Sequence, residues 1–168
     1  MSVKQDDQRF MQLAYEQAVA ASTAGEVPVG AVITRQNPDQ PPDQPPQIIA
    51  AGANARESLR DPTAHAEMIA ITQAAASVDA WRLSGCTLYV TLEPCLMCAG
   101  AILQSRIDRV VFAAYDPKGG AAESLYRVLE DSRLNHRCEV LGGVMQQRCG
   151  DLLTEFFTRR RRMSAEAN

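Results

Sequence analysis

Short apolar segments rich in β-branched residues alternate along this chain with segments of helical periodicity. Such alternation predicts an α/β fold, in which helices pack on both faces of a central sheet. The predicted helices span 6–24, 61–77, 96–105, 122–130 and 146–162, and the predicted strands span 29–34, 48–53, 87–92, 109–114 and 138–141. Because the first two strands follow each other without a helix between them, they predict a hairpin within a mixed sheet of about five strands.

The length of 168 residues is typical of one domain, so residues 1–168 are expected to form a single folded unit. Residues 36–47 hold five of the nine prolines and predict a surface loop between the first two strands, because proline cannot serve inside a ladder. Residues 163–168 are expected to form a disordered tail. No apolar run could span a bilayer and residues 1–9 are polar, so we expect a cytoplasmic protein without a membrane partner.

The chain has five cysteines, an odd number in a sequence without an evident signal peptide. A disulfide framework is therefore not expected, and a closely spaced pair points first to thiolate chemistry or metal binding. Cys95 and Cys98 form such a pair. Cys86, Cys138 and Cys149 have no partner pattern and are expected to be small buried hydrophobic residues.

Two short motifs carry the chemistry, His65-Ala66-Glu67 and Pro94-Cys95-Leu96-Met97-Cys98. On a helix, Cys95 and Cys98 share one face, and the positive field at a helix N-terminus favours their thiolates. With His65 they make three metal ligands, which leaves the fourth tetrahedral position open for water, as in catalytic zinc sites. Glu67 can lie beside that metal without binding it, where a general acid and base must sit. The combined pattern is typical of zinc-dependent nucleobase deaminases.

Each half of this pattern has a simpler interpretation when it occurs alone. A single C-x-x-C in an α/β chain is typical of thioredoxin-like redox proteins, and a lone histidine is usually structural. The joint occurrence of histidine, glutamate, proline and two cysteines at this spacing favours the catalytic zinc site.

Charge is distributed unevenly, although the net value is only −3. Residues 133–162 contain Arg133, Arg137, Arg148 and Arg159–Arg162 against Glu139, Asp151 and Glu155. Arginine makes bidentate contacts to phosphate and stacks on bases, which would suit a nucleic-acid partner. A solvated helix end, with cations near the negative end of its dipole, is an equally simple interpretation of Arg159–Arg162.

Further blocks surround the two motifs: Glu26-Val27-Pro28-Val29-Gly30-Ala31, Gly52-Ala53-Asn54, Pro62-Thr63-Ala64, Thr91-Leu92-Glu93, Ala99-Gly100-Ala101 and Asn135-His136. Together they resemble the bacterial tRNA-specific adenosine deaminase family, from Phe10 to Arg162. The resemblance implies a three-layer α/β/α fold of the cytidine-deaminase type and a homodimer with one zinc ion (Zn2+) per subunit. It also implies hydrolytic conversion of adenosine to inosine at the wobble position of a tRNA anticodon stem-loop, typically that of an arginine tRNA.

By the same resemblance, His65, Cys95 and Cys98 would bind zinc and Glu67 would move protons at the adenine ring. Asn54 would contact the purine, with Val29 and Leu92 as pocket walls and the backbone N–H of Ala66 near the ring. The residues in contact with flanking nucleotides would be Asp116, Asn135, His136 and Phe157, and those in contact with phosphates would be Arg159, Arg160, Arg161 and Arg162. Each of these residues also has a simpler interpretation: Asp116 as a turn-forming residue, Asn135 and His136 as capping polar residues, and Phe156 and Phe157 as core aromatic residues. We expect core packing for one of the two phenylalanines.

Three features depart from the family pattern: the long Pro-rich segment 36–47, Glu123, where a small residue is more usual, and a short tail. A deaminase of the same fold that acts on a free base or nucleotide, such as guanine or cytosine, is the nearest alternative; Asn54, Asn135-His136 and the basic C-terminal segment favour RNA. A zinc-stabilised RNA-binding module without catalysis is a second alternative. Glu67 argues against it, because a structural site needs no adjacent acid and normally has a fourth protein ligand.

Overall fold

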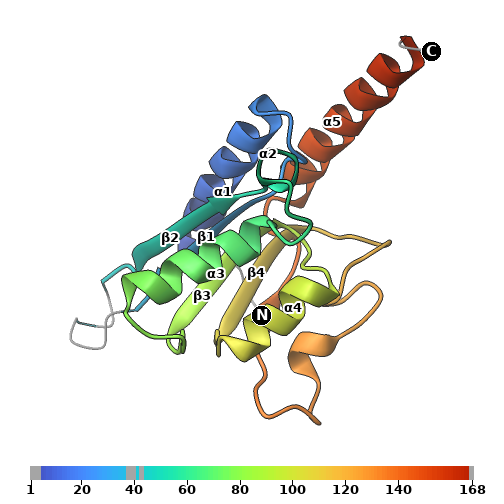
Figure 1. Ribbon diagram of the computed structural model, residues 1–168. Coiled ribbons are helices and arrows are strands. Elements are labelled where there is room, and N and C mark those ends of the chain that lie inside the picture. The colour runs from blue at the N-terminus through green and yellow to red at the C-terminus, as the bar shows by residue number, and fades with distance from the viewer. Residues whose placement is uncertain (1–4, 37–40, 42–43, 167–168) are drawn as a thin grey trace.

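A five-stranded mixed sheet organises the chain in the computed structural model, which describes residues 5–36, 41 and 44–166 (Figure 1). In chain order the elements are α1 (Gln5–Thr23), β1 (Gly30–Arg35), β2 (Gln47–Ala53), α2 (Arg56–Leu59), α3 (Ala66–Ser77), β3 (Cys86–Leu92), α4 (Leu96–Gln104), β4 (Arg109–Ala114), η1 (Val128–Glu130), β5 (Glu139–Leu141) and α5 (Gln146–Glu166). The strand order is β2-β1-β3-β4-β5. β1 pairs antiparallel with β2 and β3, whereas β3, β4 and β5 run parallel, so the predicted hairpin and mixed sheet are confirmed.

Helices cover both faces of the sheet, which confirms the predicted three-layer α/β/α architecture (Figure 1). On the face covered by α3 and α4, the buried side chains include Ile33 and Leu88 of the sheet. On the face covered by α1 and α5, they include Val32 and Tyr89. Neighbouring strand residues belong to different clusters because successive side chains of a strand point to opposite faces.

Three strand ends meet at one edge of the sheet. Gly30, at the start of β1, pairs with Ala53 at the end of β2, and Leu92, at the end of β3, pairs with Ala114 at the end of β4. Because β1 runs antiparallel to both of its neighbours, its first residue and the last residues of β2 and β3 lie at the same edge. Residues that follow β2 and β3 are therefore brought together there.

The prediction of a helix at 122–130 is wrong, since only the short 3-10 turn η1 forms in this range. The N–H groups of Ala122, Glu123 and Ser124 are donated to the carboxylate of Glu93. Further along, the N–H groups of Tyr126 and Val128 are donated to the carbonyls of Gly120 and Ala121, whereas a helix requires the carbonyl four residues earlier.

The helix predicted at 61–77 starts later, at Ala66 of α3. Asp61 Oδ1 instead accepts hydrogen bonds from the N–H and the hydroxyl of Thr63, which closes a turn ahead of the helix. The aspartate and threonine thus form a separate turn that is not part of the helix.

The short helix α2 was not predicted. The carboxylate of Glu26 accepts the N–H groups of Glu57 and Ser58 in its first turn. A helix of four residues is unstable alone, and this support comes from a residue far away in the sequence.

The last helix is longer than predicted, because α5 continues to Glu166 and projects beyond the sheet (Figure 1). The expected disordered tail at 163–168 is therefore wrong for residues 163–166, and residues 167–168 lie outside the described residues.

The Pro-rich segment 36–47 connects β1 to β2, but its residues 37–40 and 42–43 also lie outside the described residues. Among the helices that the structure describes, none combines the length and apolar character needed to cross a membrane.

Candidate active site

Three potential metal ligands from the starts of two helices meet at this edge of the sheet. His65 immediately precedes α3 and Cys95 immediately precedes α4, each with an extended backbone. Cys98 follows within the first turn of α4. The ligand atoms of all three residues lie within 4.8 Å of one another, so the structure brings the predicted ligands together.

The spacing of these three donors fits a tetrahedral zinc ion. His65 Nδ1 lies 3.7 Å from Cys95 Sγ and 3.5 Å from Cys98 Sγ. Zinc bonds of about 2.3 Å to sulfur and about 2.0 Å to nitrogen, at tetrahedral angles, place such donors about 3.6 Å apart. No fourth histidine, cysteine or carboxylate ligand joins this cluster among the described residues. One coordination position would therefore remain open.

The thiol of Cys95 is prepared to carry negative charge. A hydrogen bond from Cys98 and the neighbouring His65, working against the effect of burial, lower the pKa of Cys95 to about 3. The same hydrogen bond and burial raise the pKa of Cys98, and the hydrogen bond to Cys95 raises the pKa of His65. A thiolate held between two proton donors is a site where a cation can replace the protons.

Glu67 places a carboxyl group next to the ligands without joining them. It lies in the first turn of α3 and is 3% exposed. Burial raises its pKa above the usual value, while interactions with His65 and Cys98 oppose that shift. A glutamate in this environment can hold a proton closer to neutral pH than an exposed one, which suits a general acid and base.

Asn54 is locked in place by α3. Its backbone N–H donates a hydrogen bond to the carbonyl of Val29, and its Oδ1 accepts a hydrogen bond from the N–H of Ala66 at 2.9 Å. This bond fixes which end of the amide is oxygen. The Ala66 N–H thus serves to orient Asn54, and its place near a purine ring stays a prediction.

The two predicted pocket walls lie at the same edge of the sheet. Val29 is buried immediately before β1, and Leu92 is half-buried at the end of β3, where it packs against both core clusters. Their positions beside Asn54 and ahead of Cys95 agree with a base pocket between them, and their contact with substrate stays a prediction.

Asp116 lies in the segment that follows β4, close to the ligands. Its Oδ1 accepts the N–H of Lys118 at 3.0 Å, which is the turn-forming role considered for it. In the same segment Gly120 pairs with Cys95 in an isolated β-bridge. The structure therefore brings this segment, but not a specific contact of the Asp116 carboxylate, to the candidate site.

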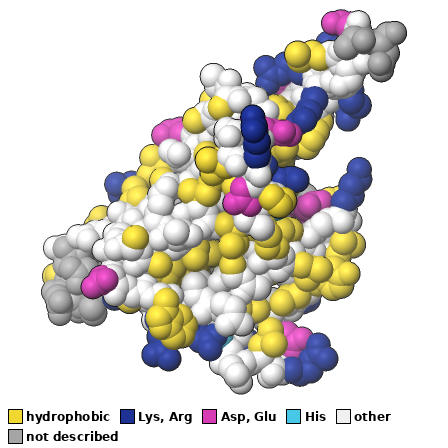
Figure 2. Space-filling view, in the orientation of Figure 1, with side chains coloured by type: hydrophobic (Ala, Val, Ile, Leu, Met, Phe, Trp, Pro, Cys, Tyr) yellow, Lys and Arg dark blue, Asp and Glu magenta, His cyan; other side chains and the backbone are white. Residues whose placement is uncertain are grey.

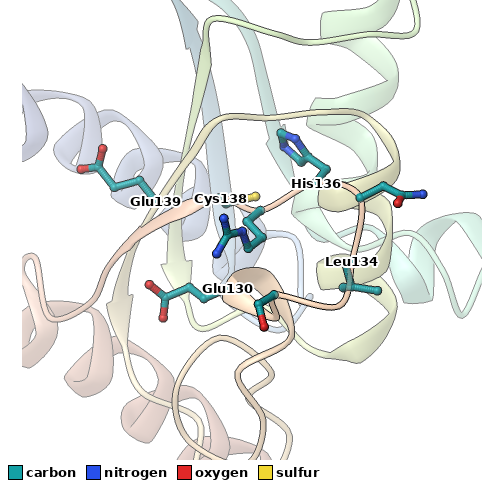
Figure 3. A pocket seen from close by; sticks show the side chains of 8 residues that line it. Glu130, Leu134, His136, Cys138 and Glu139 are labelled. Carbon is teal, nitrogen blue, oxygen red and sulfur yellow. The ribbon is translucent and has the colours of Figure 1, made fainter.

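Asn135 and His136 are not brought to the metal ligands. They line an open cavity of about 670 Å³ with Glu130 and Cys138 (Figure 3), and His136 Nε2 donates a hydrogen bond to the carbonyl of Ile107 at 2.7 Å. Ile107 follows α4, whereas Cys95 precedes it, and this nine-residue helix is about 13 Å long. Within one chain they therefore lie about the length of α4 from the ligands, and their contact with flanking nucleotides stays a prediction.

The aromatic pair and the four consecutive arginines lie on α5. Phe156 is buried and Phe157 is half-exposed, with their rings packed edge to face at 5.5 Å. One of the two therefore belongs to the core, as expected. Two of the four consecutive arginines have partners on the body of the protein, Arg159 at Ser22 and Arg160 at Glu57.

Two buried carboxylates that frame the site, Glu26 and Glu93, were missed by the sequence analysis. Each accepts backbone N–H groups from a distant segment, α2 for Glu26 and residues 116–124 for Glu93. The available signal was an acidic residue inside an apolar block just ahead of a proline, as in Glu-Val-Pro and Glu-Pro.

The other cysteines, Cys86, Cys138 and Cys149, are buried, as predicted.

Comparison with known protein sequences gives one consistent result. The pattern of the MafB19-like deaminase family matches residues 5–161. The chain is 43% identical over 164 residues to the tRNA-specific adenosine deaminase of Bacillus subtilis, an alignment that covers 96% of each protein. It is 46% identical over 155 residues to the tRNA-specific adenosine deaminase of Haemophilus influenzae, covering 92% of this chain and 85% of the relative.

Solved structures share the fold. One from a study of A-to-I editing by tRNA:A34 deaminases matches with a TM-score of 0.77 and 39% identity, over 86% of this chain and 98% of the other. A guanine deaminase from Nitrosomonas europaea matches with a TM-score of 0.75 and 25% identity, over 89% and 83% of the two chains. The backbones are about equally similar, whereas the sequence is considerably more similar to the tRNA-specific proteins.

Proposed function

The chain belongs to the tRNA-specific adenosine deaminase family, and we propose that it hydrolyses adenosine to inosine at the wobble position of the anticodon of an arginine tRNA. The observation that carries the proposal is the buried Glu67 carboxyl group beside three donors at tetrahedral spacing. We further propose that the active form is a cytoplasmic homodimer with one zinc ion per subunit.

The residues of the site divide the chemistry between them. A zinc ion held by His65, Cys95 and Cys98 would supply Lewis acidity and lower the pKa of a coordinated water, as hydrolytic deamination requires. Glu67 would take a proton from the attacking water and place it on N1 of the adenine ring. It would then take the proton of the newly added hydroxyl group and place it on the amino group, which leaves as ammonia, so one carboxyl group serves twice. Asn54 would act as a donor to the purine edge through Nδ2, because its Oδ1 is bound to Ala66.

An RNA loop suits this site as substrate. Adenine in a duplex hides its Watson–Crick edge, whereas an anticodon nucleotide can be unstacked into a pocket at low cost. Basic side chains gather along the outer part of α5, which projects from the body (Figure 2). Identity to tRNA-specific relatives, at 43% and 46%, also exceeds the 25% identity to the guanine deaminase, so RNA is preferred to a free base.

Exposed apolar side chains support the proposed homodimer. Leu96 at the start of α4 is exposed, as are Leu125, Tyr126 and Leu134 in the chain around η1, which packs beside α4. Apolar side chains clustered on a surface mark sites of protein association. A second copy of the chain is the partner that the family resemblance implies.

Mass spectrometry of the reaction products tests the proposed function directly. We expect the zinc-loaded protein to form inosine at the wobble adenosine of an arginine anticodon stem-loop and to leave free adenine, guanine and cytosine unchanged. Protein stripped of metal by a chelator should form no product until zinc is restored, because three protein ligands fit zinc. Deamination of a free base with the stem-loop untouched would reject the tRNA assignment and keep the deaminase mechanism.

Replacing Arg159–Arg162 with serine is expected to weaken binding of the stem-loop and to flatten its salt dependence. Each lost phosphate contact should reduce the slope of log K against log salt by about 0.7–0.9. Fluorescence anisotropy at several salt concentrations measures this slope, and zinc content should stay unchanged. Arg82→Ser, which removes an exposed arginine next to Trp81, is the control. An unaltered slope in the serine variant contradicts a phosphate-binding role.

A further inference from the structure

Glu93 is a buried carboxylate between the end of β3 and the ligand Cys95, and it is 2% exposed. Burying a carboxylate is unfavourable unless strong hydrogen bonds replace its hydration. Within the described residues no arginine, lysine or histidine pairs with it. Its compensation must therefore come from hydrogen-bond donors of another kind.

All of those donors belong to one segment, residues 116–124, which we name the Glu93 loop. Oε1 accepts the backbone N–H groups of Ala122, Glu123 and Ser124 at 3.2, 2.7 and 2.8 Å. Oε2 accepts the N–H of Asp116 at 2.9 Å and also the hydroxyl of Ser124. Both ends of the loop are thus fixed to a single carboxylate, because an ionised carboxylate offers acceptors on two oxygens.

Gly120 lets the loop close around this carboxylate. A Cβ atom at this position would lie only 2.3 Å from Glu93 Oε2 and 2.6 Å from Oε1. The loop can therefore approach the carboxylate this closely only with glycine there.

The Glu93 loop is also joined to the metal-ligand turn. The N–H of Ala121 is donated to the carbonyl of Pro94 at 2.8 Å, and Gly120 pairs with Cys95. The loop, held by Glu93, therefore lies directly beside the ligand Cys95.

We propose that Glu93 is a positioning residue for the RNA substrate: it holds the Glu93 loop, with Asp116, against the turn that carries Cys95. This rests on the proposed function only in that the substrate is RNA. Glu93 is not one of the three metal ligands, and its carboxylate is bound by the Glu93 loop. Its effect is on substrate binding, through the loop, and the proton transfers of Glu67 do not depend on it.

Glu93→Gln tests the proposal, because glutamine keeps the size of the side chain but turns an NH₂ group toward N–H or O–H donors on one side. Hydrogen exchange followed by mass spectrometry should show amides of residues 116–124 exchanging about tenfold faster or more. The amide of Ala66, bound to Asn54, should exchange as in the wild type, and zinc content should be unchanged. With the stem-loop, KM should rise about tenfold while kcat changes less than about threefold.

Asp7→Asn is the matched control, since Asp7 is a buried carboxylate paired with Arg109 on the opposite face of the sheet. It should lower global stability without faster exchange confined to 116–124 and without a change in KM. If Glu93→Gln does not fold, Ser124→Ala removes one exposed donor from the same carboxylate and should produce smaller changes of the same kind.

The outcomes separate the two proposals. Exchange in 116–124 that matches the wild type, or that rises equally over the whole chain, overturns the role of Glu93. Faster exchange of the loop with an unchanged KM overturns it as well, because the loop would then not position substrate. A wild-type protein that forms no inosine in the stem-loop instead rejects the proposed function, and the exchange measurements do not depend on that result.

Discussion

Replacing Glu67 with glutamine is expected to reduce turnover of the anticodon stem-loop by about 10²–10⁴-fold, the range typical for loss of a general acid and base. Glutamine has nearly the same volume, so the buried position in α3 is retained. It cannot release and accept a proton at the ring or at the leaving amino group. The loss should therefore appear in kcat, with KM for the stem-loop close to that of the wild type.

The metal content of the variant distinguishes this effect from loss of the site. Glu67→Gln should retain one zinc ion per subunit by atomic absorption, since the three ligands are untouched. Cys98→Ser should lose both metal and activity, because a serine hydroxyl is a poor zinc ligand. Glu130→Gln, which changes an exposed glutamate away from the ligands, should behave as the wild type. Turnover of Glu67→Gln within tenfold of the wild type would reject the assigned role.

The metal ligands and Glu67 could be predicted from the sequence because their arrangement is local. Cys95 and Cys98 lie within one helical turn, and His65 and Glu67 flank the first residue of α3. A helix start fixes the geometry of such residues almost independently of the rest of the fold. Only the approach of the two helix starts to each other required the sheet, and the order of strands and helices predicts that sheet.

Two of the errors involve hydrogen bonds that no local pattern reveals. In 122–130 the N–H groups of Tyr126 and Val128 are donated to the carbonyls of Gly120 and Ala121 instead of those four residues earlier, so no helical ladder forms, whereas α2 forms where Glu26 binds two N–H groups of its first turn. Local propensity contains no information about such acceptors.

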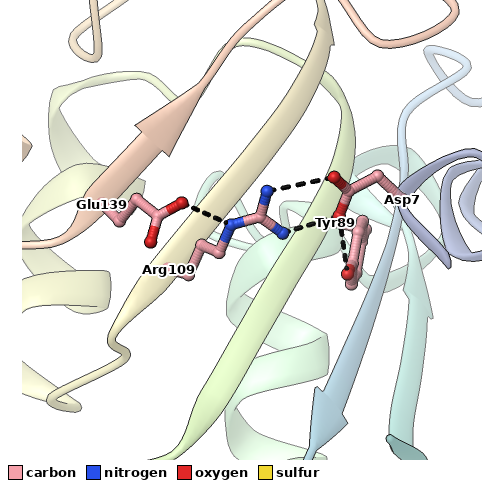
Figure 4. Close-up of polar contacts among 4 residues, drawn as sticks. All are labelled: Asp7, Tyr89, Arg109 and Glu139. Atoms are coloured by element: carbon pink, nitrogen blue, oxygen red, sulfur yellow. Dashed lines mark hydrogen bonds and ion pairs between the residues drawn. The ribbon is translucent and has the colours of Figure 1, made fainter. Parts of the chain in front are cut away.

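A buried ion pair that no sequence motif indicated connects α1 to the sheet (Figure 4). Arg109 at the start of β4 donates to both oxygens of Asp7, at 2.6 and 3.0 Å, and Tyr89 donates its hydroxyl to Oδ1 at 3.1 Å. Arg109 also pairs with Glu139 of β5 at 2.9 Å. The side chains of Asp7 and Arg109 are only 1% and 11% exposed, so water screens this pair weakly.

Asp7→Ala is expected to lower the free energy of unfolding by about 3–5 kcal/mol, because it leaves the guanidinium of Arg109 buried without its main partner. Urea denaturation at neutral pH, followed by circular dichroism, measures the change. The hydroxyl of Tyr89 loses its acceptor in the same variant, which adds to the destabilisation. Glu139→Gln should cost less than about 1 kcal/mol, since the Glu139 side chain is 40% exposed and its pairing is screened by water.

The comparison of these two variants determines whether burial, rather than the number of ion pairs, gives the network its strength. Both variants remove one carboxylate from the same arginine; they differ in the exposure of the lost group and in the Tyr89 hydroxyl, which loses its acceptor only in Asp7→Ala. Equal destabilisation by the two would contradict the dependence on burial. A cost below about 1 kcal/mol for Asp7→Ala would show that Arg109 finds water or Glu139 as a sufficient partner. The metal ligands lie on the other side of the sheet, so folded Asp7→Ala protein should still bind zinc.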